Sequence, residues 1–156
     1  MSILSSLIEK QDADKLSRYI EQLAENLVNP TNAVPLIRAA SFPDKPGVYC
    51  IFERGELIYV GETGSLKARM KDIFRTVNHS FRRSLGKRQF AGVAGVSEAN
   101  AKTSFPLDVE LQLTEYMESN IRVALTPVAI RRKEVEEKIV KKHTPIFNSR
   151  GQRGLL

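Results

Sequence analysis

The sequence has few residues of the kinds that build disulfides, zinc sites and membrane spans. It contains one cysteine, Cys50, and two histidines among 156 residues. One cysteine excludes an intrachain disulfide, and three such ligands make a structural zinc site very improbable. No apolar run approaches the roughly 20 residues that cross a bilayer, and the N-terminus lacks the pattern of a signal peptide. We therefore expect a cytoplasmic protein with no membrane contact, in which Cys50 is a small core residue.

Hydrophobic periodicity and turn residues predict a chain that alternates between helices and strands. The hydrophobic fraction of 42% and the length indicate one globular domain with its own core. The predicted elements are a helix over residues 3–28 with a stripe of Leu16, Tyr19, Ile20, Leu23 and Leu27, a loop with one helical turn over 34–44, a hairpin over 47–61, a helix over 66–77 with its N-cap at Ser65, a helix or loop over 78–90, an ordered loop over 91–104, a helix over 107–118, a strand over 121–129 near a sheet edge or strand end, and a helix over 131–143 ended by Pro145.

The register of the predicted hairpin decides whether its two tyrosines share a face. A three-residue loop that ends with Gly55 in the left-handed conformation pairs Phe52 with Glu56 and places Tyr49 directly opposite Tyr59. A two-residue loop would send the two tyrosines to opposite faces. The position of Gly55 favours the three-residue loop.

The excess positive charge is confined to two blocks of the sequence. The net charge of +6 divides into −3 over residues 1–66, +7 over 67–90, −3 over 91–130 and +5 over 131–156. If the two basic blocks lie side by side in space, they form a surface for a polyanion; the alternative is that they are solvated helix faces. The residues assigned to this nucleic-acid-binding surface are Lys67, Lys71, Arg75, His79, Arg82, Arg83, Lys87, Arg88, Lys141 and Lys142.

One glutamate of the last predicted helix stands apart from its neighbours. Glu134 and Glu137 each have a lysine four residues later, whereas Glu136 has Ile139 and Val140 on its side of the helix. An inward carboxylate requires compensation, which either a divalent metal or a buried salt bridge provides. Phosphodiester hydrolysis takes a carboxylate that holds Mg²⁺, a cation on the phosphate and a proton acceptor for water. Glu136, Arg69, Tyr49 or Tyr59, and Asn148 are of the right types.

Three segments resemble the GIY-YIG nuclease family. Gly47-Val48-Tyr49, nine intervening residues and Tyr59-Val60-Gly61 are similar to the GIY-YIG signature itself. Arg69, eight residues after Gly61, occupies the place of the arginine of the family. The segment from Glu136 to Asn148, with its lysines and Pro145, is similar to the closing segment of the family. The resemblance covers residues 46–77 and 120–149.

The resemblance implies an α/β (α+β) fold in which helices flank a central, mostly antiparallel three-stranded sheet. It implies an N-terminal helical extension over residues 1–45, a nuclease domain over 46–150 with an insertion at about 78–106, and a tail over 151–156. It also implies a one-metal endonuclease that cuts DNA. Glu136 would bind Mg²⁺ or Mn²⁺, Arg69 would hold the phosphate, Tyr49 would accept a proton from water, Tyr59 would align it, and Asn148 would fix phosphate or local backbone.

The chain departs from the family at two positions of the expected site. Many members carry His or Tyr one helical turn after the arginine, where this chain has Ile73, and lysine after the YIG glycine, where it has Glu62. We expect Ile73 to be a core residue and His79 to lie on the surface, with His79 as a substitute polar group as the alternative. An accessory protein that binds nucleic acid without cleaving it is the competing function, and the 3–28 helix suggests a homodimer.

Overall fold

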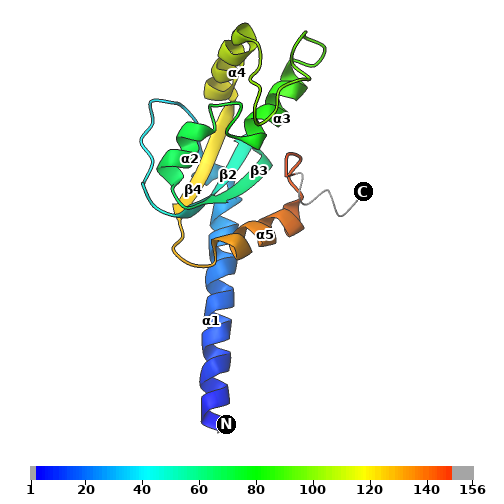
Figure 1. Cartoon of the computed structure of the whole chain (residues 1–156). Helices are drawn as coiled ribbons and strands as arrows, with labels where there is room; N and C mark the ends of the chain where they lie inside the picture. Colours follow the sequence, from blue (N-terminus) through cyan, green and yellow to red (C-terminus); the bar gives the residue numbers. More distant parts are fainter. Residues whose placement is uncertain (1–2, 149–156) are drawn as a thin grey trace.

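The computed structural model describes residues 3–148 as a twisted four-stranded antiparallel sheet with helices on both faces (Figure 1). The predicted tail at 151–156 lies outside the described residues. No helix of the described part is long and apolar enough to span a membrane. In chain order the elements are α1 (Ile3–Leu27), a 3₁₀ turn η1 (Pro30–Asn32), β1 (Val34–Pro35), β2 (Gly47–Glu53), β3 (Glu56–Thr63), α2 (Leu66–Asp72), α3 (Ser80–Gln89), α4 (Leu107–Asn120), β4 (Ile121–Pro127) and α5 (Arg132–His143).

The sheet has four strands in the order β1-β4-β2-β3, one more than expected. The additional strand is β1, whose two residues pair with Val123 and Arg122 of β4. The sequence predicted a loop here. A strand of two residues, one of them a proline, is too short to show the alternating pattern of a strand. As a result β4 is an inner strand, and Pro127 is its last residue, where a missing amide hydrogen costs no ladder bond.

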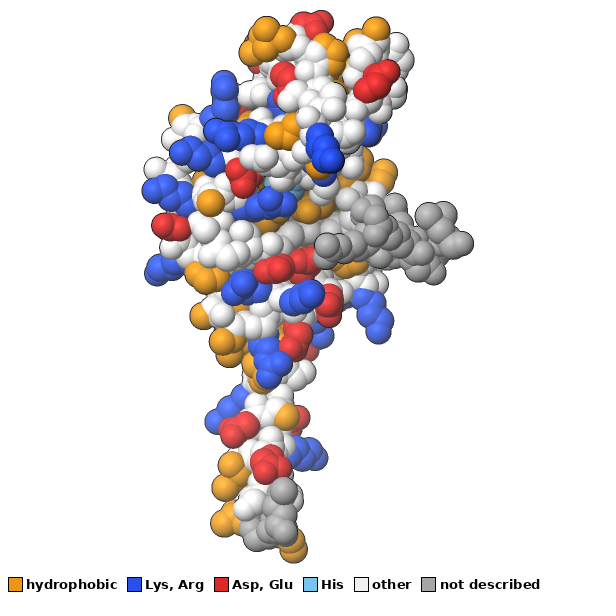
Figure 2. Space-filling model, in the orientation of Figure 1, with side chains coloured by type: hydrophobic (Ala, Val, Ile, Leu, Met, Phe, Trp, Pro, Cys, Tyr) orange, Lys and Arg blue, Asp and Glu red, His pale blue; other side chains and the backbone are white. Residues whose placement is uncertain are grey.

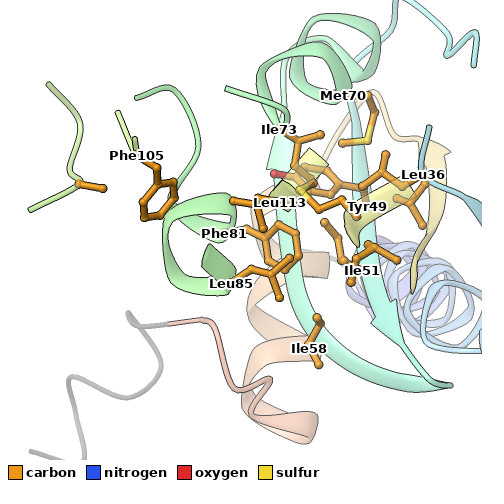
Figure 3. Packing of buried hydrophobic residues seen from close by; sticks show 14 of the residues in the cluster. Leu36, Tyr49, Ile51, Ile58, Met70, Ile73, Phe81, Leu85, Phe105 and Leu113 are labelled. Carbon is orange, nitrogen blue, oxygen red and sulfur yellow. The ribbon is translucent and has the colours of Figure 1, made fainter. Parts of the chain in front are cut away.

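Strand β2 is buried on both faces, and its side chains alternate between two hydrophobic clusters. Tyr49 and Ile51 belong to the larger cluster, which includes residues of α2, α3 and α4 (Figure 3). Val48, Cys50 and Phe52 belong to the second, which includes residues of α1 and α5. The core placement predicted for Cys50 is confirmed. Because hydrophobic side chains cover both faces of the sheet, polar side chains are accommodated at its edge strand β3.

The predicted register of the β2–β3 hairpin is wrong, although the two tyrosines do share a face. The loop has two residues, Arg54 and Gly55, both with positive φ as a type I′ turn requires. Such a loop alone would separate the tyrosines. The register shifts between Ile51 and Phe52, where Ile58 is an extra residue on β3. This bulge turns Tyr59 back to the face of Tyr49, so that Tyr59 pairs with Ile51 and lies diagonally from Tyr49.

The long helix α1 confirms the predicted 3–28 helix, and its C-terminal half packs on the sheet. Ile20, Ala24 and Leu27 are buried in the cluster shared with α5. The N-terminal half projects away from the body (Figure 1). The apolar stripe that suggested a homodimer is therefore largely used within the chain, and the homodimer stays a prediction.

The helix predicted over residues 66–77 ends at Asp72. The Ser65 side chain accepts a hydrogen bond from the Ala68 amide, which confirms the predicted N-cap. Ile73 caps the C-terminus and is fully buried, as its place in the apolar stripe predicted. Because α2 stops early, the chain turns through 74–79 and starts α3 over the sheet. Phe81 and Leu85 of α3 then join the larger cluster beside Tyr49 (Figure 3).

Candidate active site

A pocket of about 740 Å³ brings all five predicted catalytic residues together. It lies over β3, between the α2–α3 side of the sheet and helix α5. Its volume is within the range of ligand pockets, about 300–1,000 Å³. Sequence reasoning had not assigned Ser80 or Lys133 to it. The lining residues are Tyr49, Tyr59, Gly61, Glu62, Arg69, Ser80, Lys133, Glu136, Glu137, Val140, Lys141, Thr144, Phe147 and Asn148.

Gly61 makes room for the Tyr49 ring at the floor of the pocket. The two residues are paired across the β2–β3 ladder. A Cβ added to Gly61 would lie 2.4 Å from the Tyr49 hydroxyl oxygen, closer than any real contact. The Tyr49 ring therefore lies over the Gly61 backbone, with 1% of the residue exposed. The ring of Tyr59 lies 6.1 Å from it, centroid to centroid, within the range of favourable aromatic pairs.

His79 is buried against Tyr49 and does not lie on the surface. Its Nε2 is 2.8 Å from the Tyr49 hydroxyl oxygen, and its Nδ1 accepts a hydrogen bond from the Phe81 amide as the N-cap of α3. The expectation of a surface histidine is wrong, and so is its assignment as a nucleic-acid contact, because none of the residue is exposed. The alternative, a substitute polar group at the site, agrees with this position.

Burial and charge set the protonation of these groups. Burial raises the pKa of Tyr49 above its ordinary value, and Tyr59 adds to this, while the Arg69 guanidinium only partly offsets it. Burial, with Arg69 and Arg83 nearby, lowers the pKa of His79 to about 3. At neutral pH both side chains are therefore uncharged in the protein alone.

Arg69 is half-buried on the pocket side of α2. Its Nη1 donates to the Asn78 carbonyl oxygen at 3.2 Å. This bond links the helix to the turn that precedes His79. Its position between the aromatic floor and solvent suits a cation that meets an anionic group entering the pocket.

Glu136 enters the pocket from α5, the helix that packs on the opposite face of the sheet. Val135 and Ile139 are the buried residues of this helix, and Glu136 lies beside them, half-buried. Of the neighbouring acidic residues, Glu137 also lines the pocket. Glu134 forms an ion pair with Arg131 at 2.7 Å. Glu136, which the sequence singled out because no lysine follows it four residues later, thus faces the pocket.

Asn148 binds the outer edge of β3 through its side chain. Its Oδ1 accepts from the Val60 amide at 2.9 Å, and its Nδ2 donates to the Val60 carbonyl oxygen at 2.8 Å. The Phe147 amide donates to the Ile58 carbonyl oxygen at 3.0 Å. Phe147 and Asn148 thus form hydrogen bonds with backbone groups on the free edge of β3. Of the two roles considered for Asn148, this contact is with local backbone.

Glu62, which replaces the expected lysine, lies at the rim of the pocket and pairs with Arg132. The distance from Arg132 Nε to the Glu62 carboxylate is 3.1 Å, and both side chains are about one-third exposed. Arg132 begins α5 one helical turn before Glu136. The pair therefore connects the end of β3 to the helix that carries Glu136.

The predicted nucleic-acid-binding residues divide into exposed and internal groups. Lys67, Lys71 and Arg75 are exposed on or just after α2, the side of the molecule on which Lys and Arg side chains gather in Figure 2. Lys87 on α3 and Lys141 and Lys142 on α5 are also exposed. Arg83 is partly exposed and donates to the Thr76 carbonyl oxygen.

Two further arginines of α3 make contacts within the protein, Arg82 in the interior and Arg88 at the surface. Arg82 is 1% exposed and pairs with Glu110 at 2.7 Å, so its assignment as a nucleic-acid contact is wrong. Arg88 is exposed, pairs with Glu53 at 2.6 Å and lies over the Phe147 ring, and its assignment as a nucleic-acid contact stays a prediction.

The comparisons with known proteins place this pocket in a family. The model of the GIY-YIG catalytic domain matches residues 44–155, most of the chain and all the residues of the pocket. The chain therefore belongs to the GIY-YIG catalytic domain family, whose members are in general endonucleases. No curated protein and no solved structure matches the sequence.

Proposed function

We propose that the protein is a metal-dependent endonuclease that hydrolyses phosphodiester bonds of DNA. The observation that carries this proposal is the convergence of Tyr49, Tyr59, Arg69, Glu136 and Asn148 on one pocket. These residues come from β2, β3, α2, α5 and the segment after α5. A convergence from five places in the chain of the residue types that hydrolysis needs supports a catalytic site.

The donor set fits a single hard cation. Among the described residues no cluster of three or more His, Cys, Asp or Glu side chains is arranged for a metal. Mg²⁺ is commonly held by one or two carboxylates together with substrate phosphate oxygens and water. Glu136 would hold the Mg²⁺ or Mn²⁺ ion, with Glu137 on the same pocket wall. The ion would polarise the phosphate and neutralise charge that develops on it.

The protein residues would then divide the remaining work among themselves. Arg69 would bind a non-bridging oxygen of the scissile phosphate. The ionised oxygen of Tyr49 would take a proton from the water whose oxygen attacks phosphorus, as the bond from phosphorus to the leaving sugar oxygen breaks. Tyr59 would orient that water, and Asn148 would hold β3 in place. Because burial raises the pKa of Tyr49, its ionisation requires the added positive charge of the metal and Arg69.

The exposed lysines and arginines would guide the DNA to the pocket. Lys67, Lys71 and Arg75 lie on the α2 side, and Lys141 and Lys142 lie on α5. Lys141 also lines the pocket. Phosphate contacts of this kind give salt-dependent binding without sequence preference.

The raised pKa of Tyr49 also favours a second candidate, a nucleic-acid-binding protein that does not cleave. Cleavage of supercoiled plasmid with Mg²⁺ or Mn²⁺ separates the two functions. We expect nicking or linearisation by the wild type and a loss of at least about 100-fold in Glu136→Gln, which keeps size but removes the charge. Glu115→Gln, on the exposed side of α4, is the matched control. Equal cleavage by Glu136→Gln and the wild type would exclude the proposed mechanism, whereas salt-dependent binding without cleavage would select the second candidate.

A further inference from the structure

The hydrogen bonds of His79 fix which of its nitrogens carries the proton. The Phe81 amide can only donate, and it lies 3.1 Å from Nδ1, so Nδ1 is the acceptor. A neutral imidazole has one acceptor and one donor nitrogen, and hence Nε2 carries the hydrogen. Protonation of Nδ1 would place two N–H groups against each other, which is a second reason, besides burial, for the ring to stay neutral.

The assigned tautomer determines the role of the Tyr49 oxygen. Nε2–H donates to this oxygen at 2.8 Å, so the Tyr49 hydroxyl hydrogen must point to another acceptor. When Tyr49 loses its proton, the Nε2–H donor is still in place and stabilises the phenolate. His79 cannot take that proton itself, because Nε2 is already protonated and Nδ1 is engaged by Phe81.

The course of the chain after α2 explains why this histidine can reach the tyrosine. The residue one helical turn after Arg69 is Ile73, which is fully buried in the hydrophobic core. The turn at 74–79 returns the chain to the sheet, where His79 lies within 5.5–6.1 Å of the Tyr59 and Tyr49 rings, centroid to centroid. Neither the His79 ring nor the Tyr49 ring can rotate freely in such packing.

We propose that His79 is a positioning residue: a neutral N–H donor, fixed in one tautomer by the N-terminus of α3, that holds Tyr49 as the proton acceptor of the site. The proposal rests on the proposed nuclease function for its catalytic consequence. The tautomer itself follows from the fold alone. The two parts can therefore fail separately.

The tautomer is measured by ¹⁵N NMR of the full-length protein. His143→Gln removes the other histidine, which is exposed at the end of α5, and leaves a single imidazole signal. We expect an unprotonated Nδ1 and a protonated Nε2 that do not change between pH 5 and pH 8. The reverse tautomer, or titration of the ring within that interval, would overturn the proposal whether or not the protein cleaves DNA.

The catalytic consequence is measured with a matched pair of variants. His79→Asn keeps a side chain that caps α3 well but is too short to reach Tyr49, and His79→Gln restores the length and an N–H donor. We expect kcat of His79→Asn with Mg²⁺ to fall about 100-fold at pH 7 with little change in KM, and His79→Gln to recover part of it.

The pH profile distinguishes this role from simple support of the fold. Without the N–H donor the phenolate forms at higher pH, so the pH at which kcat stops rising should be higher in His79→Asn than in the wild type. A kcat that levels off at the same pH in both proteins, with the variant's circular dichroism matching the wild type, would show a purely structural role and overturn the proposal. Absence of cleavage by the wild type would reject the proposed function and leave the tautomer to the NMR result.

Discussion

Helices α2 and α3 are similarly basic in sequence, but of the two only α3 carries a fully buried cation. Lys67 and Lys71 of α2 lie in solvent, whereas Arg82 of α3 is 1% exposed and bonds to groups inside the protein. The difference arises because α3 packs against more elements of the fold than α2 does. Helix α2 buries one apolar face, whereas α3 packs on the sheet with Phe81 and Leu85 and on α4 with Arg82. A basic helix therefore provides a nucleic-acid surface only where the fold leaves it uncovered.

The largest expected effect is on stability, from removal of the internal arginine. Arg82 donates to Glu110, Thr76 and Met117, so Arg82→Met removes one hydrogen bond from each of these groups. We expect a loss of about 3 kcal/mol in the free energy of unfolding, measured with urea, because the variant breaks an internal ion pair and leaves the Glu110 carboxylate without its cation. Lys67→Met on α2 is the control and should change it by less than about 0.5 kcal/mol. Similar losses for the two variants would contradict the division into internal and external cations.

Removal of the exposed cations should instead weaken DNA binding. For the variant Lys67→Ala/Lys71→Ala/Arg75→Ala we expect affinity for duplex DNA to fall about 10-fold to 100-fold, with unchanged stability. The slope of log K against log salt should decrease by about 0.9 for each phosphate that the variant no longer neutralises.

The matched control for this triple variant removes the same charge elsewhere. Lys10→Ala/Lys15→Ala/Arg18→Ala changes three exposed residues of α1, the helix whose N-terminal half projects from the body (Figure 1). Equal loss of affinity in both triple variants would show that net charge, and not the α2 surface, determines binding.

Glu110, the carboxylate that pairs with Arg82, should make the free energy of unfolding depend on pH in the acidic range. Burial by itself would raise the pKa of Glu110, but hydrogen bonds from Thr76 and Arg82 outweigh it and hold this pKa below its ordinary value. A lowered pKa stabilises the fold above the ordinary value of about 4.3, and this contribution is lost as the pH falls below it. Urea unfolding between pH 7 and pH 3 should therefore show a smaller acid-dependent loss in Glu110→Gln than in the wild type. Parallel curves would contradict this assignment.

The smallest expected effect concerns the ion pair at the pocket rim. Glu62 and Arg132 are about one-third exposed, so solvent screens their attraction. We expect Glu62→Gln to lower the free energy of unfolding by about 0.5 kcal/mol or less. A double-mutant cycle with Arg132→Gln measures the coupling. A coupling as large as the loss in Arg82→Met would show that exposure does not distinguish the two pairs.

Local patterns in the sequence predicted most elements and the main residues of the pocket. The Ser65 cap, the hairpin and the helix ended by Pro145 depend on turn residues and periodicity within a few positions of one another. The predicted catalytic set depended on three spaced motifs and on the family resemblance. These residues line one pocket because each motif fixes the direction of its own side chain relative to its strand or helix.

The sequence by itself determined the residue types of the site and the elements that carry them. Only the tertiary structure decided that the bulge at Ile58 restores the shared face of the tyrosines, that His79 is buried against Tyr49, and that Arg82 turns inward while Lys67 faces solvent. The reason is that these outcomes depend on contacts between segments far apart in the chain, and charge counts or periodicity within one segment contain no information about which face another segment will cover.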